Sequence, residues 1–227
     1  MKHNIKHVFF DLDHTLWDFD KNSGLTFEKI FKLNNIKVRL EDFLSVYEPI
    51  NLNYWKLYRE ERVTKSALRY GRLKEAFDAI NYKVEDNVIQ QLSEGYITHL
   101  SSFNYLFDYT SEILDYLKKK YELHIITNGF EEAQEKKMQT SKIRDYFVTV
   151  TNSEMVGVKK PNPKIFNFAL NLAKAKPNES IMIGDNIEAD IEGALATGMD
   201  TIHFDYKNMH QHSYKRITNL KSLLDHL

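Results

Sequence analysis

Short apolar runs rich in β-branched and aromatic residues recur along the chain, and each predicts a buried strand. The runs are Ile5–Phe10, Leu123–Ile126, Tyr146–Val150, Ile181–Ile183 and Thr201–Phe204. Segments with apolar residues at helical spacing lie between the later runs: Ser111–Lys120, with Ser111 as the expected N-cap, Asn162–Ala173 and Ala189–Thr197. Strands that alternate with helices are typical of an α/β fold, so we predict a doubly wound parallel sheet with helices on both faces.

The segment 19–103 has a different pattern, because its apolar residues recur at helical spacing and no run in it predicts a strand. We expect Thr64 and Asp86 to cap two of its helices. We also expect a helix to be broken near Pro49, because proline removes a helical hydrogen bond. The pattern predicts an α-helical unit inserted after the first strand.

The composition is that of a globular protein, with 42% hydrophobic and 28% charged residues. The formal net charge of −1 excludes a strongly basic protein that coats nucleic acid. The chain has no cysteine, which excludes disulfides, zinc–thiolate sites, iron–sulfur clusters and thiol catalysis.

No apolar run approaches the ~20 residues that span a bilayer, and the run Val8–Phe10 ends at Asp11, unlike a secretory signal. We therefore expect a cytoplasmic protein whose partners are neither membranes nor nucleic acid polymers.

Polar side chains follow directly after three of the predicted strands. They are Asp11 and Asp13, Thr127 and Asn128, and Asp185. Ligands of open α/β sheets bind at the carboxyl ends of the strands, so these residues are expected to converge on one pocket. Any one aspartate alone is more typical of a turn or a helix cap. Several carboxylates crowded together repel one another unless a cation lies between them, and oxygen ligands favour Mg²⁺.

Four segments, in this order along the chain, resemble the four sequence motifs of the haloacid dehalogenase (HAD) superfamily. They are Asp11–Leu16, Ile126–Gly129, Gly157–Phe166 with Lys160 as the matching lysine, and Gly184–Asp185 followed by Asp190. Each motif alone is weak, whereas the ordered set is specific. The resemblance implies a Rossmann-like catalytic core of residues 1–16 and 107–227, with an inserted α-helical cap domain of residues 17–106.

The resemblance implies a role for each matching residue. Asp11 is expected to be the nucleophile that forms an aspartyl-phosphate, and Asp13 to protonate the leaving oxygen and then activate water. The Thr127 hydroxyl and the Asn128 backbone N–H are expected to hold the phosphate oxygens that are not transferred. Lys160 is expected to neutralise charge in the ground state and the transition state.

The resemblance also implies a Mg²⁺ ion held by the Asp11 carboxylate, the Asp13 backbone carbonyl and the Asp185 carboxylate. Asp190 is expected either to support these ligands from behind or to cap a helix. Expulsion of a halide needs neither a proton donor at this position nor a metal. The presence of Asp13 and Asp185 therefore favours phosphoester hydrolysis over dehalogenation.

Within the superfamily, the chain is most similar to the pyrimidine-nucleotide 5′-nucleotidases. The similar segments are Leu16–Asp20, Tyr70–Leu73, Ile125–Phe130 and Val156–Asn162. This similarity implies that the partner is a small phosphorylated metabolite, a nucleoside monophosphate. Trp17 and Arg72 are then expected among the substrate-binding residues.

The sequence leaves other functions open. A sugar-phosphate phosphatase, a phosphoglycolate phosphatase or a phosphohexose mutase would use the same motifs. A catalytically idle binding or regulatory protein is a further alternative, although such a scaffold would be expected to lose Asp11, Asp13 or Lys160. We expect His203, His210 and His212 to be surface residues rather than metal ligands. No feature of the sequence predicts an oligomeric state.

Overall fold

The computed structural model describes residues 5–209 and 213–227, which form two compact units. One unit runs up to Phe19 and resumes at Asn104–Leu227, and the other is the segment Asp20–Phe103. The chain therefore crosses between the units at two points, a few residues inside the boundaries of 17 and 106 expected from the sequence. Within the described ranges, no helix is long and apolar enough to cross a membrane.

The first unit is built on a six-stranded parallel sheet with the strand order β3-β2-β1-β4-β5-β6. The strands are β1 (His7–Phe10), β2 (Glu122–Thr127), β3 (Phe147–Asn152), β4 (Ser180–Gly184), β5 (Asp200–Phe204) and β6 (Arg216–Ile217). This sheet confirms the predicted α/β fold. The sequence did not predict β6, because a strand of two residues is too short to show a periodic pattern.

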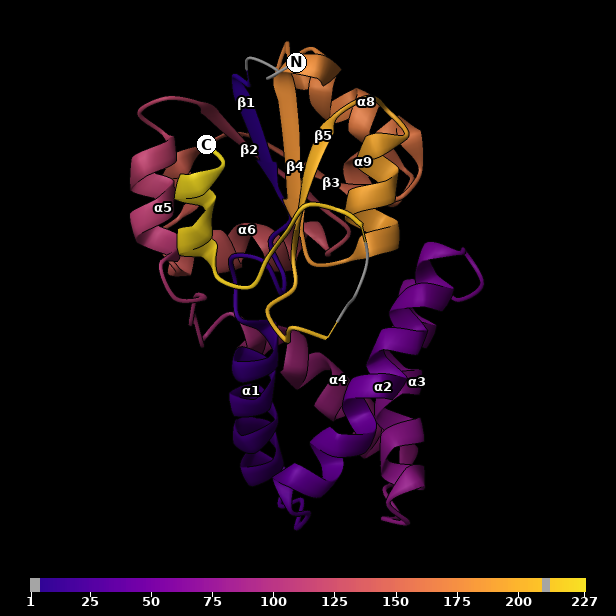
Figure 1. Cartoon of the computed structure of the whole chain (residues 1–227). Coiled ribbons are helices and arrows are strands. Elements are labelled where there is room, and N and C mark those ends of the chain that lie inside the picture. The colour runs from indigo at the N-terminus through magenta and orange to yellow at the C-terminus, as the bar shows by residue number, and fades with distance from the viewer. Residues whose placement is uncertain (1–4, 210–212) are drawn as a thin grey trace. The chain divides into compact units, whose positions relative to one another are not determined.

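Helices cover both faces of the sheet (Figure 1). They are α5 (Thr110–Leu117), α6 (Glu131–Thr140), α7 (Ser153–Val156), α8 (Pro163–Leu172) and α9 (Gly193–Leu195), with short 3-10 or π segments η1 (Arg144–Tyr146), η2 (Pro177–Glu179), η3 (Ile187–Glu192) and η4 (Leu220–Asp225). In Figure 1, α5 and the C-terminal segment lie on one side of the sheet, and α8 and α9 on the other. Under α8, the buried strand residues Phe9, Ile126 and Met182 form one apolar cluster with Phe166 and Leu170.

The strand order places a topological switch point between β1 and β4. From β1, the sheet extends through β2 to β3 on one side, and through β4 and β5 to β6 on the other. The crevice at the carboxyl ends of the strands beside such a point is where open α/β sheets bind their ligands. Asp11 directly follows β1 and Asp185 directly follows β4, so both aspartates lie at this point.

The second unit is helical. Its helices are α1 (Phe19–Leu33), α2 (Leu40–Arg59), α3 (Lys65–Ala79) and α4 (Asp86–Leu100). Aromatic rings fill its core, and the ring centroid of Phe27 lies 4.6–4.9 Å from those of Phe43, Tyr47 and Tyr96. Separations in this range are typical of favourable aromatic pairs.

The structure confirms one of the helix caps predicted in this unit and contradicts the predicted helix break. The expected cap at Thr64 is confirmed, because its hydroxyl accepts a hydrogen bond from the Ala67 N–H at 3.2 Å. The expected break at Pro49 is wrong, because Pro49 lies inside α2. Buried Tyr47 precedes the proline and buried Tyr58 follows it. Packing on both sides therefore holds the helix together across the missing hydrogen bond.

Two predicted caps are also wrong. Asp86 is the first residue of α4 rather than its cap, and its carboxylate accepts a hydrogen bond from the Tyr70 hydroxyl at 2.7 Å. Ser111 lies inside α5, which begins at Thr110 after Tyr109 in a left-handed conformation with φ 68°. The two helices therefore begin one or two residues before the positions that local spacing predicts.

We expect Phe27→Ala to lower the free energy of unfolding of the helical unit by about 3–5 kcal/mol, because it leaves a cavity among packed rings. Chemical denaturation followed by circular dichroism would measure this change. Leu33→Ala, at an exposed position of the same helix, is the matched control and should lower the free energy far less. Equal losses in the two variants would contradict the assignment of Phe27 to the core.

Candidate active site

Asp11 and Asp185 are placed at one edge of the sheet by the pairing of their strands. The backbone N–H of Asp11 donates to the carbonyl of Ile183 at 2.9 Å, which continues the β1–β4 ladder to the last residues of both strands. The buried Thr15 hydroxyl lies 3.5 Å from Oδ1 of Asp185 and donates to it. The two carboxylates expected to hold a metal are therefore brought together by backbone pairing rather than by a flexible loop.

Lys160 reaches this edge from the loop between α7 and α8. Its Nζ lies 2.6 Å from Oδ1 of Asp11 and 2.6 Å from Oδ1 of Asp190, and it donates to the Ile126 carbonyl at 2.7 Å. The side chain is almost fully buried. Lys159, its half-buried neighbour in the sequence and the nearest rival in the motif, is not the residue that makes these contacts.

Asn128 fixes the backbone of Lys160. Its Nδ2 donates to the Lys160 carbonyl at 3.0 Å, and its Oδ1 accepts from the Lys160 N–H at 2.7 Å. The sequence predicted a role for the backbone N–H of Asn128. The structure adds that the Asn128 side chain holds the loop that carries the lysine, so the second and third motifs are joined directly.

Asp190 lies inside the π-helical segment η3, and Asn186 caps that segment by accepting from the Ala189 N–H at 2.9 Å. The alternative in which Asp190 is the cap is therefore wrong. Its Oδ2 accepts from the Asn186 N–H at 3.0 Å, while its Oδ1 faces Lys160. Gly184 permits this packing, because a Cβ atom there would lie 2.3 Å from Oδ2 of Asp190.

Burial dominates the electrostatics of the acidic cluster. It raises the pKa of Asp11 to about 7, with Lys160 opposing the rise and Asp190 and Asp13 adding to it. Burial also raises the pKa of Asp185 well above its usual range, helped by repulsion from Asp190 and Asp11. Burial alone would lower the pKa of Lys160, but attraction to Asp11 and Asp190 raises it instead.

The cluster fits a hard divalent cation. Asp11, Asp185 and Asp190 each offer a carboxylate oxygen within 4.8 Å of the others, and oxygen ligands suit Mg²⁺. The single charge of Lys160 cannot balance three ionised carboxylates, and repulsion among the carboxylates adds to the effect of burial in raising the pKa of Asp11 and that of Asp185. Both oxygens of Asp190 are already engaged, which leaves Asp11 and Asp185 as the better placed carboxylate ligands.

Asp13 is held by two residues that the sequence analysis did not single out. Lys137 donates from Nζ to Oδ1 of Asp13 at 2.6 Å, and Gln134 donates from Nε2 to Oδ2 at 3.0 Å. Both side chains come from α6 and are almost fully buried. Their spacing of three residues places them on one helical face, a signal present in the sequence but not specific without the position of α6.

Thr127 is oriented by the same helix. Its hydroxyl accepts from Gln134 Nε2 at 2.7 Å and from the Gly129 N–H at 3.1 Å. With both lone pairs engaged, the hydroxyl hydrogen is left to be donated to an anion. Gly129 allows the close approach of Gln134, because a Cβ atom at Gly129 would lie 2.3 Å from the Gln134 side chain.

Trp17 and Arg72 are each buried inside their own unit. Lys137 Nζ lies 4.4 Å from the centroid of the Trp17 ring, which is fully buried. Arg72, on α3, donates from Nη1 to Oδ1 of Asn51 at 2.8 Å and lies 4.9 Å from the centroid of the Tyr96 ring. In this structure both residues form part of the interior rather than an exposed contact surface.

The expectation that His203 is a surface residue is wrong. His203 is fully buried on β5, and its Nε2–H donates to the backbone carbonyl of Asp185 at 2.7 Å. It therefore helps to fix the backbone of a candidate metal ligand. Its strand, β5, is the neighbour of β4, a pairing that the sequence alone does not give. His210 and His212 lie outside the described residues.

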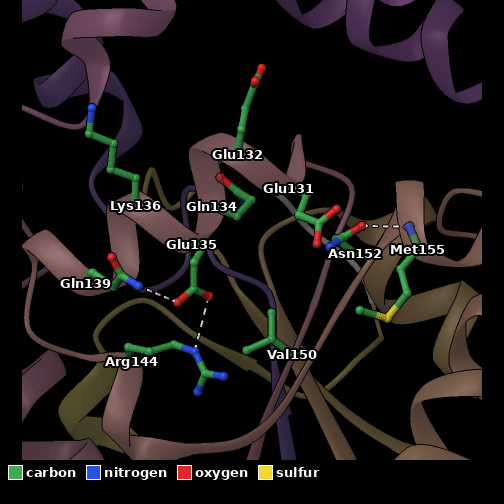
Figure 2. A pocket seen from close by; sticks show the side chains of 10 residues that line it. All are labelled: Glu131, Glu132, Gln134, Glu135, Lys136, Gln139, Arg144, Val150, Asn152 and Met155. Carbon is green, nitrogen blue, oxygen red and sulfur yellow. Dashed lines mark hydrogen bonds and ion pairs between the residues drawn. The ribbon is translucent and has the colours of Figure 1, made fainter.

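A pocket of about 680 Å³ lies beside the site, between α6 and β3. Figure 2 shows its largely polar lining, in which Glu135 interacts with both Gln139 and Arg144. Gln134 lines this pocket and also donates to Asp13, but none of the clustered aspartates lines the pocket. We therefore place the candidate active site at the strand ends and not in this pocket.

Comparisons with known proteins point to one family of hydrolases. The model of a haloacid dehalogenase-like hydrolase family matches residues 5–198. Pyrimidine 5′-nucleotidase YjjG of Escherichia coli is 33% identical over 196 residues, covering 86% of this chain and 83% of that protein. A glyceraldehyde 3-phosphate phosphatase of Pyrococcus furiosus is 32% identical over 208 residues, covering 89% and 81%.

A solved structure agrees as well. The HAD-hydrolase YfnB of Bacillus subtilis, determined with bound magnesium, superposes with a TM-score of 0.90 at 25% identity over 99% of both chains. The family match covers most of the sequence, including all four motif segments. The resemblance drawn from these motifs is confirmed: the chain belongs to the haloacid dehalogenase-like hydrolase family and is an enzyme.

Proposed function

We propose that this enzyme is a Mg²⁺-dependent phosphomonoester hydrolase that forms an aspartyl-phosphate on Asp11 and acts on nucleoside 5′-monophosphates. The observation that carries the proposal is the convergence of Asp11, Asp185 and Lys160 at the switch point, with Asp13 held nearby by α6. Dehalogenation would require no proton donor at Asp13, whereas expulsion of an alcohol does.

The reaction has two half-reactions. An oxygen of Asp11 attacks phosphorus, the ester P–O bond breaks, and Asp13 donates a proton to the departing alcohol oxygen. Asp13 then takes a proton from water, whose oxygen attacks phosphorus and releases Asp11 and inorganic phosphate. Lys137 and Gln134 support this role, because they hold both oxygens of Asp13 in one orientation.

The other residues stabilise the phosphoryl group. The Thr127 hydroxyl and the Asn128 backbone N–H would hold the oxygens that are not transferred, and Lys160 would offset their charge. Asp11, the backbone carbonyl of Asp13 and Asp185 would hold Mg²⁺, which shields the approach of one anion to another. The bound magnesium of the similar YfnB structure supports this ion.

The choice of nucleotides rests on similarity to a pyrimidine 5′-nucleotidase over most of the chain. The second candidate is a phosphorylated triose or sugar, supported by similarity at nearly the same identity to a glyceraldehyde 3-phosphate phosphatase. Both substrates leave the chemistry at Asp11 and Asp13 unchanged, so a substrate panel separates them.

We expect phosphate release to require Mg²⁺ and to be fastest with pyrimidine monophosphates. The measurement is phosphate release from nucleoside monophosphates, sugar phosphates and phosphoglycolate, with Mg²⁺ and with EDTA. Turnover led by sugar phosphates would overturn the nucleotide assignment.

Asp11→Asn, which keeps the side-chain shape, should fold normally and lose at least about 10⁴-fold in kcat. Activity retained by Asp11→Asn would overturn the nucleophile.

We expect Asp185→Asn to raise the Mg²⁺ concentration at half-maximal rate at least about tenfold, because one charged ligand is lost. The measurement is the rate as a function of Mg²⁺ concentration at saturating substrate. Glu188→Gln, a nearby acidic residue in η3, is the matched control and should leave the titration unchanged. An unshifted titration in Asp185→Asn would remove Asp185 from the metal site.

We expect Lys137→Met to lower kcat by about 10- to 100-fold with little change in KM, because Asp13 loses one of the groups that orient it. The loss should be smaller with p-nitrophenyl phosphate, whose leaving group needs less protonation. Lys136→Met, the exposed neighbour on α6, is the control. An equal loss of kcat with the nucleotide and with p-nitrophenyl phosphate would mean that Lys137 supports the fold and does not orient Asp13.

A further inference from the structure

Two histidines and a glutamate meet at the other end of the sheet, away from the catalytic carboxylates. His7 begins β1, and Glu122 begins β2, near the N-terminal end of the sheet in Figure 1. The parallel register pairs His7 with Glu122 and Phe9 with His124. Because alternate residues of a strand share a face, His7, Glu122 and His124 lie on one face of the sheet.

The ligand atoms of these side chains converge. His7 Nδ1 lies 3.2 Å from His124 Nε2 and 3.5 Å from Glu122 Oε2. All three atoms lie within 4.8 Å of one another. His7 Nδ1 therefore faces one imidazole nitrogen and one carboxylate oxygen, and these three atoms can each give an electron pair to the same cation.

We propose that His7, Glu122 and His124 form a binding site for a Zn²⁺-type transition-metal ion, separate from the catalytic site. Tetrahedral zinc has ligand bonds of roughly 2.0–2.2 Å, which correspond to ligand–ligand edges of about 3.3–3.6 Å. The separations around His7 Nδ1 are close to such edges. Two imidazoles and one carboxylate supply three ligands, and water would supply the fourth.

The surroundings support the histidines as ligands. His124 Nδ1 lies 2.9 Å from the Thr149 hydroxyl on β3, which directs the opposite nitrogen, Nε2, toward His7. Metal-binding imidazoles are usually fixed through their second nitrogen in this way. The ring of Phe9 stacks on His124 with centroids 4.5 Å apart and limits its rotation.

Glu122 gives the ion access from solvent. His124 is fully buried and His7 nearly so, whereas the Glu122 side chain is 58% exposed. An ion can therefore enter from the Glu122 side and keep a water ligand there. In this proposal the ion has no part in the reaction. It links the first residues of β1 and β2 and stabilises the folded state by the free energy of its binding.

Donor chemistry distinguishes this site from the catalytic one. Imidazole nitrogen favours zinc, cobalt, nickel and copper, whereas the oxygen donors of Asp11 and Asp185 suit Mg²⁺. Excess Mg²⁺ can therefore occupy the catalytic carboxylates while a second metal is titrated into the histidine site. The two proposals can then fail independently, because phosphate release reports one site and the second metal reports the other.

The test uses the full chain, stripped of metal and held in excess Mg²⁺. We expect one equivalent of Zn²⁺ to raise the melting temperature, and one equivalent of Co²⁺ to give the intense visible absorption of a four-coordinate site with nitrogen ligands. His7→Gln should weaken both responses at least tenfold and leave Mg²⁺-dependent phosphate release unchanged. His226→Gln, an exposed histidine of the same unit, is the matched control and should behave like the parent chain.

Glu122→Gln keeps the test decisive if His7→Gln folds poorly, because Glu122 is exposed and its substitution leaves the core intact. We expect it also to weaken Zn²⁺ binding. Three results would overturn the proposal: no Zn²⁺ response in the parent chain, a six-coordinate Co²⁺ spectrum, or equal responses in Glu122→Gln and His226→Gln.

Discussion

The ammonium group of Lys160 lies 2.6 Å from oxygens of both Asp11 and Asp190 and is almost completely removed from water. Removing both carboxylates would leave a buried charge without a partner, at a cost of roughly 3–5 kcal/mol. Several neighbouring groups at this edge of the sheet hold this contact in place. Asn128 holds the lysine backbone, the Ile126 carbonyl takes another ammonium hydrogen, and Gly184 leaves space for Asp190.

The excess of carboxylate over ammonium explains why a stable fold also forms a reactive site. Full compensation by protein cations would satisfy the cluster and leave nothing for a ligand. Instead, burial raises the pKa of Asp11 to about 7 and that of Asp185 well above its usual range, so the ionised cluster favours an added cation. The parallel sheet can hold this arrangement because its central strands are fixed by neighbours on both sides.

The order of elements and the convergence of Asp11, Asp185 and Lys160 at one edge of the sheet could be predicted, because strand runs and motif spacing are local properties of the sequence. Residues whose importance depends on a distant neighbour were missed. Lys137 and Gln134 matter because α6 faces Asp13, and His203 matters because β5 pairs with β4. The predicted break at Pro49 failed for the same reason, since packing along the whole helix outweighed a local signal.

The connection to the helical unit has a consequence for how such enzymes diversify. The outgoing and returning chains lie side by side within the catalytic unit. Trp17 and Leu106 form an antiparallel bridge, Asp18 N donates to the Tyr105 carbonyl at 3.1 Å, and Phe107 N donates to the Leu16 carbonyl at 3.0 Å. The inserted segment therefore begins and ends at adjacent points. A gene can exchange or lengthen that segment without altering the path of the sheet, so the helical unit can evolve as a module while the residues at the strand ends are inherited unchanged.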